Sequence, residues 1–285
     1  MPGGPSSWSD RSDASRERLA RIVREPGCDL AEAALLLCVE HDPDVDVELG
    51  LLRIDALADG LRSTGFTPSG DAAVDANAIA RYLADQQGFT GDTETYNDPR
   101  NGLLSQVLDR RRGLPITLSV LFVALARRLR VPAYGIGLPG HFVAGVASSD
   151  DRGVVVVDPF AGGRLLPLEE VAERVRAATG GRVSFSRAML RPAAPADVVR
   201  RILANLTRDF TAAGDLRDAL WTAELALLLP GSQPEDHRVH GELLRSAGRF
   251  LAAAEAFEAY VELAPTAPDR DEVRHAAIAV RARCN

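Results

Sequence analysis

Residues 113–130 read GLPITLSVLFVALARRLR, and this stretch decides the fold. Pro115 suits the first turn of a helix, because the N–H that proline lacks would have had no partner there. The residues after it are apolar on almost every side, which is typical of a helix buried at the centre of a domain. We therefore expect a central helix from Pro115 to about Arg130, with Thr117 and Ser119 as the hydroxyls near its start.

The apolar pattern changes from a helical period to an alternating one after this helix, which predicts strands. Three runs show the alternation: 133–138, 141–147 and 153–158. The first two are separated by Pro139-Gly140, and the last two by the short loop 148–152. Because a short loop joins antiparallel neighbours most simply, we expect a small antiparallel sheet.

Helical periodicity surrounds this core on both sides. It covers 15–61, where Asp29 can cap a second helix, and returns at 75–87 and 168–178. Asn101 looks like the cap of a short helix over 102–110. Residues 1–14 are rich in Gly, Pro, Ser and Asp, so we expect them to be disordered.

The C-terminal part, 197–285, is helical throughout and contains an internal repeat. Ala213-Gly214-Asp215-Leu216 aligns with Ala247-Gly248-Arg249-Phe250 at a shift of 34 residues, and a proline follows each unit. A helix pair with a Gly turn and a terminal Pro resembles the tetratricopeptide repeat. The prolines of 192–195 predict a boundary between this tail and a core domain over 15–191. The fold class expected is α+β and mostly helical, with a small antiparallel sheet and an all-helical tail.

Composition excludes several classes of protein. The 285 residues carry a net charge of −7 spread along the chain, which argues against a nucleic-acid partner. We expect no membrane span, because no uninterrupted apolar run reaches 18 residues, and no secretory signal, because the N-terminus is polar. The 3 cysteines form no C-x-x-C pair, so neither a disulfide scaffold nor a structural zinc site is expected. These features predict a reduced, cytoplasmic protein.

The sequence contains none of the common motifs that bind a cofactor. All 33 basic residues are arginine, so there is no lysine for a Schiff base, for pyridoxal phosphate or for a Walker-A loop. A dinucleotide-binding glycine motif is missing as well. We therefore expect no cofactor.

Of the 5 histidines, His141 is the candidate for chemistry. It begins one predicted strand, and Asp158 ends the next. On adjacent antiparallel strands such a pair can come within hydrogen-bond reach, which would be half of a nucleophile–His–Asp triad. The alternative is a buried histidine that a loop-terminal aspartate merely satisfies. The remaining histidines have no metal-ligand spacing, so we expect no metal site and assign them to caps or solvated faces: His41, His237, His240 and His275.

Three segments together resemble the SirB-type transglutaminase-like proteins. They are YNDPRNGLLSQVLDRRRGLPITLSVLFVALARRL from Tyr96, LPGHFVAGV from Leu138 and VVVVDPFAGG from Val154. The tail segments ILANLTRDF, RDALWTAELALLLP and AYVELAPTAPD are similar to the family's C-terminal region. The resemblance covers nearly the whole chain from Asp29, and it implies a transglutaminase- or papain-like core followed by tetratricopeptide-like repeats.

The resemblance also implies which residues would form the site. The wider superfamily uses Cys, His and Asp, with the Cys at the start of the central helix. His141 and Asp158 match the His and the Asp, whereas Pro115 occupies the place of the nucleophile. None of the three cysteines lies at a matching position: Cys28, Cys38 and Cys284.

Two hypotheses follow, and the first is favoured. In the first, the chain is a non-catalytic protein- or peptide-binding adaptor. Its cleft or its repeats would bind a partner, and the cleft residues would be Asn101, Arg112, Pro115 and Phe142. In the second, it is a hydrolase or acyl transferase: His141 is the general base, Asp158 orients it, and water, Thr117 or Ser119 is the nucleophile. Asn101 and backbone N–H groups at the helix start would then polarise a carbonyl.

Overall fold

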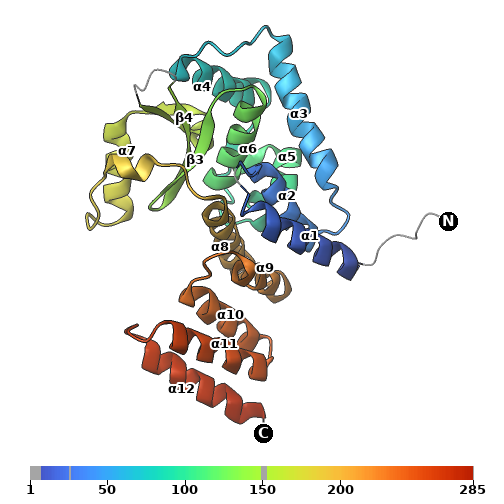
Figure 1. Ribbon diagram of the computed structural model, residues 1–285, viewed down its shortest axis with the longest axis vertical. Coiled ribbons are helices and arrows are strands. Elements are labelled where there is room, and N and C mark those ends of the chain that lie inside the picture. The colour runs from blue at the N-terminus through green and yellow to red at the C-terminus, as the bar shows by residue number, and fades with distance from the viewer. Residues whose placement is uncertain (1–7, 26, 149–152, 285) are drawn as a thin grey trace, which may run out of the picture. The chain divides into compact units, whose positions relative to one another are not determined.

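The computed structural model describes residues 8–25, 27–148 and 153–284 (Figure 1). The chain divides into two compact units, Met1–Ile202 and Leu203–Asn285. The division falls at Ile202, a few residues after the expected boundary at 192–195. Ala193 N–H donates to Gly135 O over 2.9 Å, and Arg201 Nη1 donates to Leu138 O over 2.8 Å. These bonds fasten the proline-rich segment and the start of the next helix to the sheet of the first unit.

Four helices open the first unit, and aspartates cap three of them. They are α1 (Trp8–Ile22), α2 (Leu30–His41), α3 (Val47–Ser63) and α4 (Ala72–Arg81), the last continued by a π-helical turn over Tyr82–Gln86. The carboxylates of Asp29, Asp46 and Asp71 accept from the free N–H groups of the first turns of α2, α3 and α4.

Helix α1 corrects the expectation of disorder over 1–14. It begins at Trp8, whereas residues 1–7 lie outside the described residues. The buried carboxylate of Glu40 on α2 accepts from Ser12 Oγ at 2.7 Å and from Arg16 Nη2 at 2.7 Å. A polar stretch is ordered here by one buried acid on another helix, and local composition carries no sign of such a partner.

The predicted central helix is present as α6 (Pro115–Arg128), and every residue from Pro115 to Ala126 is buried. Pro115 occupies its first turn, as the sequence indicates. The chain reaches α6 through a 3-10 turn (Pro99–Asn101), α5 (Leu104–Arg110) and β2 (Arg112–Gly113). Strand β2 pairs in parallel with β1 (Thr90–Gly91), a two-residue ladder that the sequence did not predict.

A four-stranded antiparallel sheet lies beside α6, in the order β3-β4-β5-β6 (Figure 1). Its strands are β3 (Ala133–Leu138), β4 (His141–Ala147), β5 (Val154–Asp158) and β6 (Arg164–Leu166). The first three confirm the predicted strands, and β6 is additional. The 3-10 turn Pro159–Ala161 links β5 to β6, and α7 (Leu168–Ala178) and the 3-10 turn Arg187–Leu190 follow. Val171 and Val175 of α7 pack into the apolar cluster of the sheet.

The second unit is all-helical, as expected. Helix α8 (Pro195–Ala213) leads into α9 (Leu216–Leu228), α10 (Pro234–Ser246), α11 (Phe250–Leu263) and α12 (Arg270–Arg281), which a 3-10 turn (Ala282–Cys284) ends. Gly214 and Gly248 have φ of +77° and +73°, so the repeated glycine is a left-handed turn that ends one helix before the next. Phe257 of α11 is fully buried among residues of α10 and α12.

Within the described residues, no helix is both long enough and apolar enough to cross a membrane. The fold is α+β and mostly helical, and it ends in helical repeats.

Candidate functional site

The ends of two adjacent strands bring His141 and Asp158 together. His141 is the first residue of β4 and Asp158 is the last residue of β5. Because the two strands are antiparallel, both residues lie at the same end of the strands. His141 Nε2 lies 3.0 Å from Asp158 Oδ2, so the hydrogen bond that the strand pattern predicts is formed. Asp158 is 1% exposed and the side chain of His141 16%.

The bond assigns the tautomer of His141. Because a carboxylate only accepts, Nε2 must carry the proton that it donates to Asp158. In the neutral ring Nδ1 then holds the lone pair. Among the described residues, Nδ1 has no hydrogen-bond partner. Phe160, in the turn after β5, stands edge-on to the imidazole with ring centres 6.5 Å apart, and Tyr96 stands edge-on to Phe160 at 5.8 Å.

Asp158 accepts hydrogen bonds from three other groups besides His141. Arg174 Nη1 donates to the same oxygen, Oδ2, over 2.6 Å. The other oxygen, Oδ1, accepts from the backbone N–H groups of Phe160 and Ala161 at 3.2 and 3.3 Å. Burial by itself would raise the pKa of Asp158, but the hydrogen bonds and charges of His141 and Arg174 outweigh it and lower that pKa below its usual value.

Arg174 is a site residue that the sequence analysis missed. It lies on α7, the helix that follows β6. Strand β6 pairs with β5, so the chain turns back along the strand that ends in Asp158. Its Nη2 also donates to Glu170 Oε1 over 3.1 Å, and Glu170 pairs in turn with Arg164. The only trace of this network in the sequence is the spacing of Glu170 and Arg174, which puts an acid and a base on one helix face.

The start of α6 holds both candidate nucleophilic hydroxyls in structural roles. Thr117 Oγ1 accepts from Leu114 N–H at 3.0 Å and donates to Asn101 O over 2.7 Å. Ser119 Oγ donates to Phe142 O over 3.4 Å. Thr117 and Ser119 are both 0% exposed. The nucleophile role weighed for them is therefore wrong, because neither oxygen meets solvent and each is bonded to backbone.

Asn101 neither caps a helix nor faces a cleft. Helix α5 begins at Leu104, and Asn101 ends the preceding 3-10 turn. Its Nδ2 donates to Thr95 O over 2.8 Å and its Oδ1 accepts from Arg110 Nη1 at 3.1 Å. Fully buried and bonded at both ends, this amide is not placed to polarise a substrate carbonyl, which corrects both expectations.

Arg110 also lies 3.5 Å from Asp92, a buried carboxylate that the sequence analysis did not single out. Burial opposes the ionised form, yet hydrogen bonds from Thr95 and Asn101 and the charge of Arg110 lower the pKa of Asp92. This network fixes the loop that precedes α5.

The other predicted cleft residues lie in different surroundings. Phe142 is 2% exposed with the Arg201 guanidinium 5.6 Å over its ring, so it belongs to the core and does not line a binding surface. Pro115 is also buried. Arg112 is exposed, and its Nη1 lies 3.5 Å from Glu94. Of these three, Arg112 alone remains open to a ligand.

The cysteines with described side chains are buried free thiols. Burial, followed by the charges of Asp29 and Glu32, raises the pKa of Cys28 to about 11. Burial likewise raises the pKa of Cys38, whose sulfur accepts from Ser105 N–H. Since the thiolate is the nucleophilic form, neither side chain is set up for acyl transfer. In the described part of the chain, no three His, Cys, Asp or Glu side chains gather as metal ligands.

Five cavities of the described part of the chain have volumes from about 10 to about 510 Å³, and His141 lines none of these five. The largest lies between α1, α2 and the start of α3.

Comparison with known proteins finds two family matches in the chain. Residues 50–204 match the transglutaminase-like superfamily, and residues 210–277 match the tetratricopeptide repeat. A UPF0162 protein of Xylella fastidiosa (strain 9a5c) is 36% identical over 252 residues, which cover 86% of this chain and 87% of that protein. A UPF0162 protein of Pseudomonas aeruginosa is 31% identical over 79% of this chain and 80% of its own length.

Two further likenesses are partial. Human F-box only protein 21 is 32% identical over 125 residues, which are 40% of this chain and 20% of that protein. The crystal structure of menin superposes with a TM-score of 0.49 and 12% identity over 94% of this chain and 68% of menin.

Proposed function

This chain belongs to the transglutaminase-like superfamily and to the UPF0162 family, and from that premise we propose that it is a non-catalytic protein-binding adaptor. In this proposal the transglutaminase-like unit is a folded support that has lost the superfamily's acyl chemistry. The tetratricopeptide repeats of the second unit bind the partner.

The start of α6 is the observation that carries the proposal. A covalent acyl intermediate needs an exposed nucleophile beside its base. Pro115 stands at the first turn, and the hydroxyls of Thr117 and Ser119 are buried and bonded to backbone. The two cysteines with described side chains are buried as well.

The bonding of Asp158 supports the same conclusion. In a working triad the carboxylate orients the imidazole and stabilises the imidazolium that forms during the reaction. Arg174 shares Oδ2 with His141 and offsets the negative charge that the imidazolium would need. The arrangement is one of a buried ion pair that joins β5 to α7.

The second unit supports the binding half of the proposal. Tetratricopeptide repeats form extended surfaces that other proteins contact. Four large aliphatic side chains of this unit are at least 49% exposed: Leu228, Leu251, Leu263 and Ile278. Such side chains are suitable apolar anchors for a protein partner. We place the protein in the reducing cytoplasm, where Cys28 and Cys38 would stay as thiols.

One observation favours a hydrolase as the second candidate. Nδ1 of His141 has no partner among the described residues, and the side chain keeps 16% exposure. A water molecule held by Nδ1 would be activated by a base that Asp158 orients.

The experiment separates the two candidates with three variants of the full chain. We would measure hydrolysis of p-nitrophenyl esters and of a peptide-amide library by the wild type and by His141→Ala. In parallel, quantitative affinity capture would compare the wild type with Leu251→Arg and Ile278→Arg. The adaptor proposal expects equal background hydrolysis with and without His141, and the same partner lost from a repeat variant while His141→Ala retains it. Turnover that disappears in a folded His141→Ala protein would overturn the proposal in favour of the hydrolase.

A further inference from the structure

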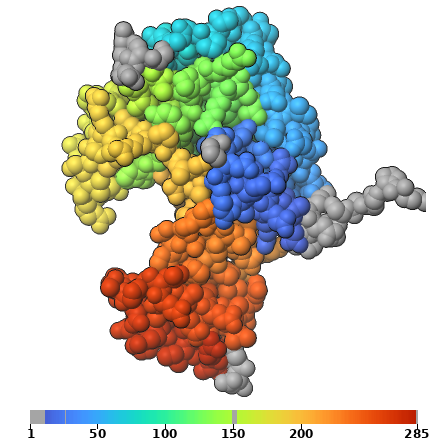
Figure 2. All heavy atoms as spheres, viewed as in Figure 1, coloured from blue at the N-terminus to red at the C-terminus, as the bar shows by residue number. Residues whose placement is uncertain are grey.

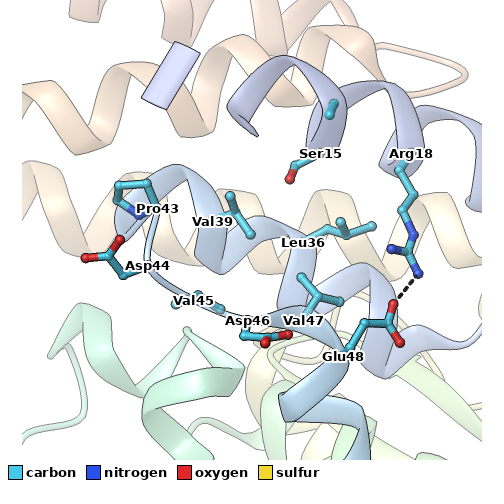
Figure 3. Close-up of a pocket in the computed structure, with 11 residues that line it drawn as sticks. Ser15, Arg18, Leu36, Val39, Pro43, Asp44, Val45, Asp46, Val47 and Glu48 are labelled. Atoms are coloured by element: carbon cyan, nitrogen blue, oxygen red, sulfur yellow. Dashed lines mark hydrogen bonds and ion pairs between the residues drawn. The ribbon is translucent and has the colours of Figure 1, made fainter. Parts of the chain in front are cut away.

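A groove of about 510 Å³ lies between α1, the C-terminal part of α2 and the segment that leads into α3 (Figure 3). It shares no residue with the His141–Asp158 pair. Leu36 and Val39 of α2 are buried and form its floor, and Ser15 and Arg18 of α1 stand on the opposite wall. Helices α1 and α3 contribute to the visible surface of the first unit in Figure 2. The volume is in the range of ordinary ligand sites.

The segment 43–48 gives the groove two chemical faces. Its sequence, PDVDVE, alternates acidic and apolar side chains. Asp44, Asp46 and Glu48 are exposed and Val45 and Val47 are partly exposed, and all five line the groove (Figure 3). Asp46 has extended backbone angles, φ −91° and ψ 108°, and its side chain accepts from Leu49 N–H and so caps α3.

Contacts between the helices hold the groove open without a ligand. Arg18 Nε donates to Glu32 Oε1 over 2.7 Å, and Arg18 Nη2 lies 3.1 Å from Glu48 Oε1 and closes one end of the groove. The bonds of Ser12 and Arg16 to Glu40 anchor α1 to α2. The walls are therefore fixed before binding, which reduces the entropy that a ligand must overcome.

Charge and apolar surface together define the ligand. The lining carries three carboxylates and one guanidinium, which gives a formal charge of −2 above an aliphatic floor. Directly after Glu48, Leu49 and Leu52 of α3 are 57% and 61% exposed and extend the apolar surface.

We propose that this groove is a second protein-binding surface, and that its ligand is an extended basic segment of a partner protein. The segment would alternate aliphatic side chains with arginine or lysine. Its aliphatic groups would contact Leu36, Val39 and the two valines, and its cations would meet the carboxylates of segment 43–48. This surface is separate from the repeats, so it goes beyond the function proposed above.

The test uses three capped, fluorescent model peptides and the full chain. Their sequences are RLRLRLR, RSRSRSR, which lacks the aliphatic groups, and ELELELE, which reverses the charge. We expect saturable binding of RLRLRLR below about 1 mM, at least tenfold tighter than binding of either other peptide. The Cδ and Cγ methyl signals of Leu36, Val39, Val45 and Val47 should shift in methyl NMR spectra, because these side chains line the groove.

Two pairs of matched variants make the assignment specific. Asp44→Arg and Glu173→Arg change the total charge equally, but only the first residue lines the groove, and Glu173 is exposed on α7. Ala14→Trp fills the groove, and Ala177→Trp places the same ring on an exposed position of α7. Asp44→Arg should weaken RLRLRLR binding about tenfold, since two charge units at about 5 Å in water correspond to that factor. Ala14→Trp should weaken it by a similar factor, because the added ring takes the space that the aliphatic side chains of the peptide would fill. The α7 variants should change it less than twofold.

Equal weakening by both arginine variants would reduce the effect to non-specific attraction between a cationic peptide and an acidic protein, and would overturn the proposal. Methyl shifts confined to the repeats, or equal binding of ELELELE, would also overturn it. None of these results touches the adaptor function of the repeats, which the Leu251 and Ile278 variants test independently.

Discussion

Replacement of Asp158 by asparagine should destabilise the first unit by about 3 kcal/mol. Asp158 is 1% exposed and accepts four hydrogen bonds, of which those from His141 Nε2 and Arg174 Nη1 meet at Oδ2. An asparagine can keep the two backbone bonds at its carbonyl oxygen, but its NH₂ group then faces two donors. Loss of one partner from a buried ion pair costs about 3–5 kcal/mol. The lower end applies here because Arg174 is 29% exposed and retains Glu170.

The effect should depend on pH in a defined direction. Folding lowers the pKa of Asp158, so the carboxylate's contribution is complete above the pKa of an unfolded aspartate, about 3.9. It is lost as the pH falls through the lower folded value. The stability difference between wild type and Asp158→Asn should therefore be constant near neutral pH and narrow below about pH 4.

Urea unfolding read by pulsed hydrogen exchange measures the first unit alone, through peptides of α6 and β4. A thermal shift of about 6–12 °C is the equivalent expectation for a unit of this size. Asp85→Asn is the matched control, because this acid is 62% exposed and pairs with Arg81 across one helical turn; it should cost less than about 0.5 kcal/mol. A loss below about 1 kcal/mol for Asp158→Asn, or a difference that persists unchanged to pH 3, would refute this account of the ion pair.

Three further predictions concern other parts of the chain. Thr117→Val should lower the free energy of unfolding by about 0.5–1.5 kcal/mol, because it removes the bonds of the hydroxyl to Leu114 N–H and Asn101 O, two groups that still bond each other over 3.0 Å; urea titration should show Thr117→Ser recovering most of the loss, and no such recovery would contradict the bonding role. Gly241→Ala should destabilise the second unit by about 1–3 kcal/mol, since a Cβ there would lie 2.6 Å from the Phe257 ring; faster hydrogen exchange in α10 and α11 is the measurement, and unchanged exchange would mean that α10 can shift freely. In the native protein at pH 7, Cys28 and Cys38 should react with Ellman's reagent at least tenfold more slowly than in guanidinium, because both are buried and the pKa of Cys28 is about 11; equal rates would show that these thiols are accessible.

The central helix and the sheet could be read from the sequence because their signals are local. A proline followed by a nearly continuous apolar run specifies a buried helix, and β3 and β4 have the bounds that alternation predicts. The His141–Asp158 bond follows from those same strands, since two consecutive antiparallel strands must bring an end and a start together. The repeat of the tail is likewise a pattern within one segment.

The parts that could not be predicted depend on partners distant in sequence. Asn101 has the composition of a cap, yet Arg110 and Thr95 occupy its amide and the helix begins three residues later. Order in α1 depends on Glu40, 28 residues beyond Ser12. Arg174 reaches Asp158 only because β6 turns the chain back, and β6 itself is three residues long. Each of these contacts is set by tertiary packing that no window of sequence contains.

Under the proposed adaptor function, the shared oxygen of Asp158 also bears on whether acyl chemistry could be regained. A cysteine at position 115 would restore a nucleophile but leave Arg174 on the carboxylate that should serve the imidazole. Removal of Arg174 first would leave a buried carboxylate with one partner fewer, at a cost in folding stability and with no activity in return. Neither the cysteine at position 115 nor the removal of Arg174 would by itself restore activity. Selection for activity would therefore favour neither substitution alone. In that proposal the ion pair between Asp158 and Arg174 would oppose a stepwise return to catalysis.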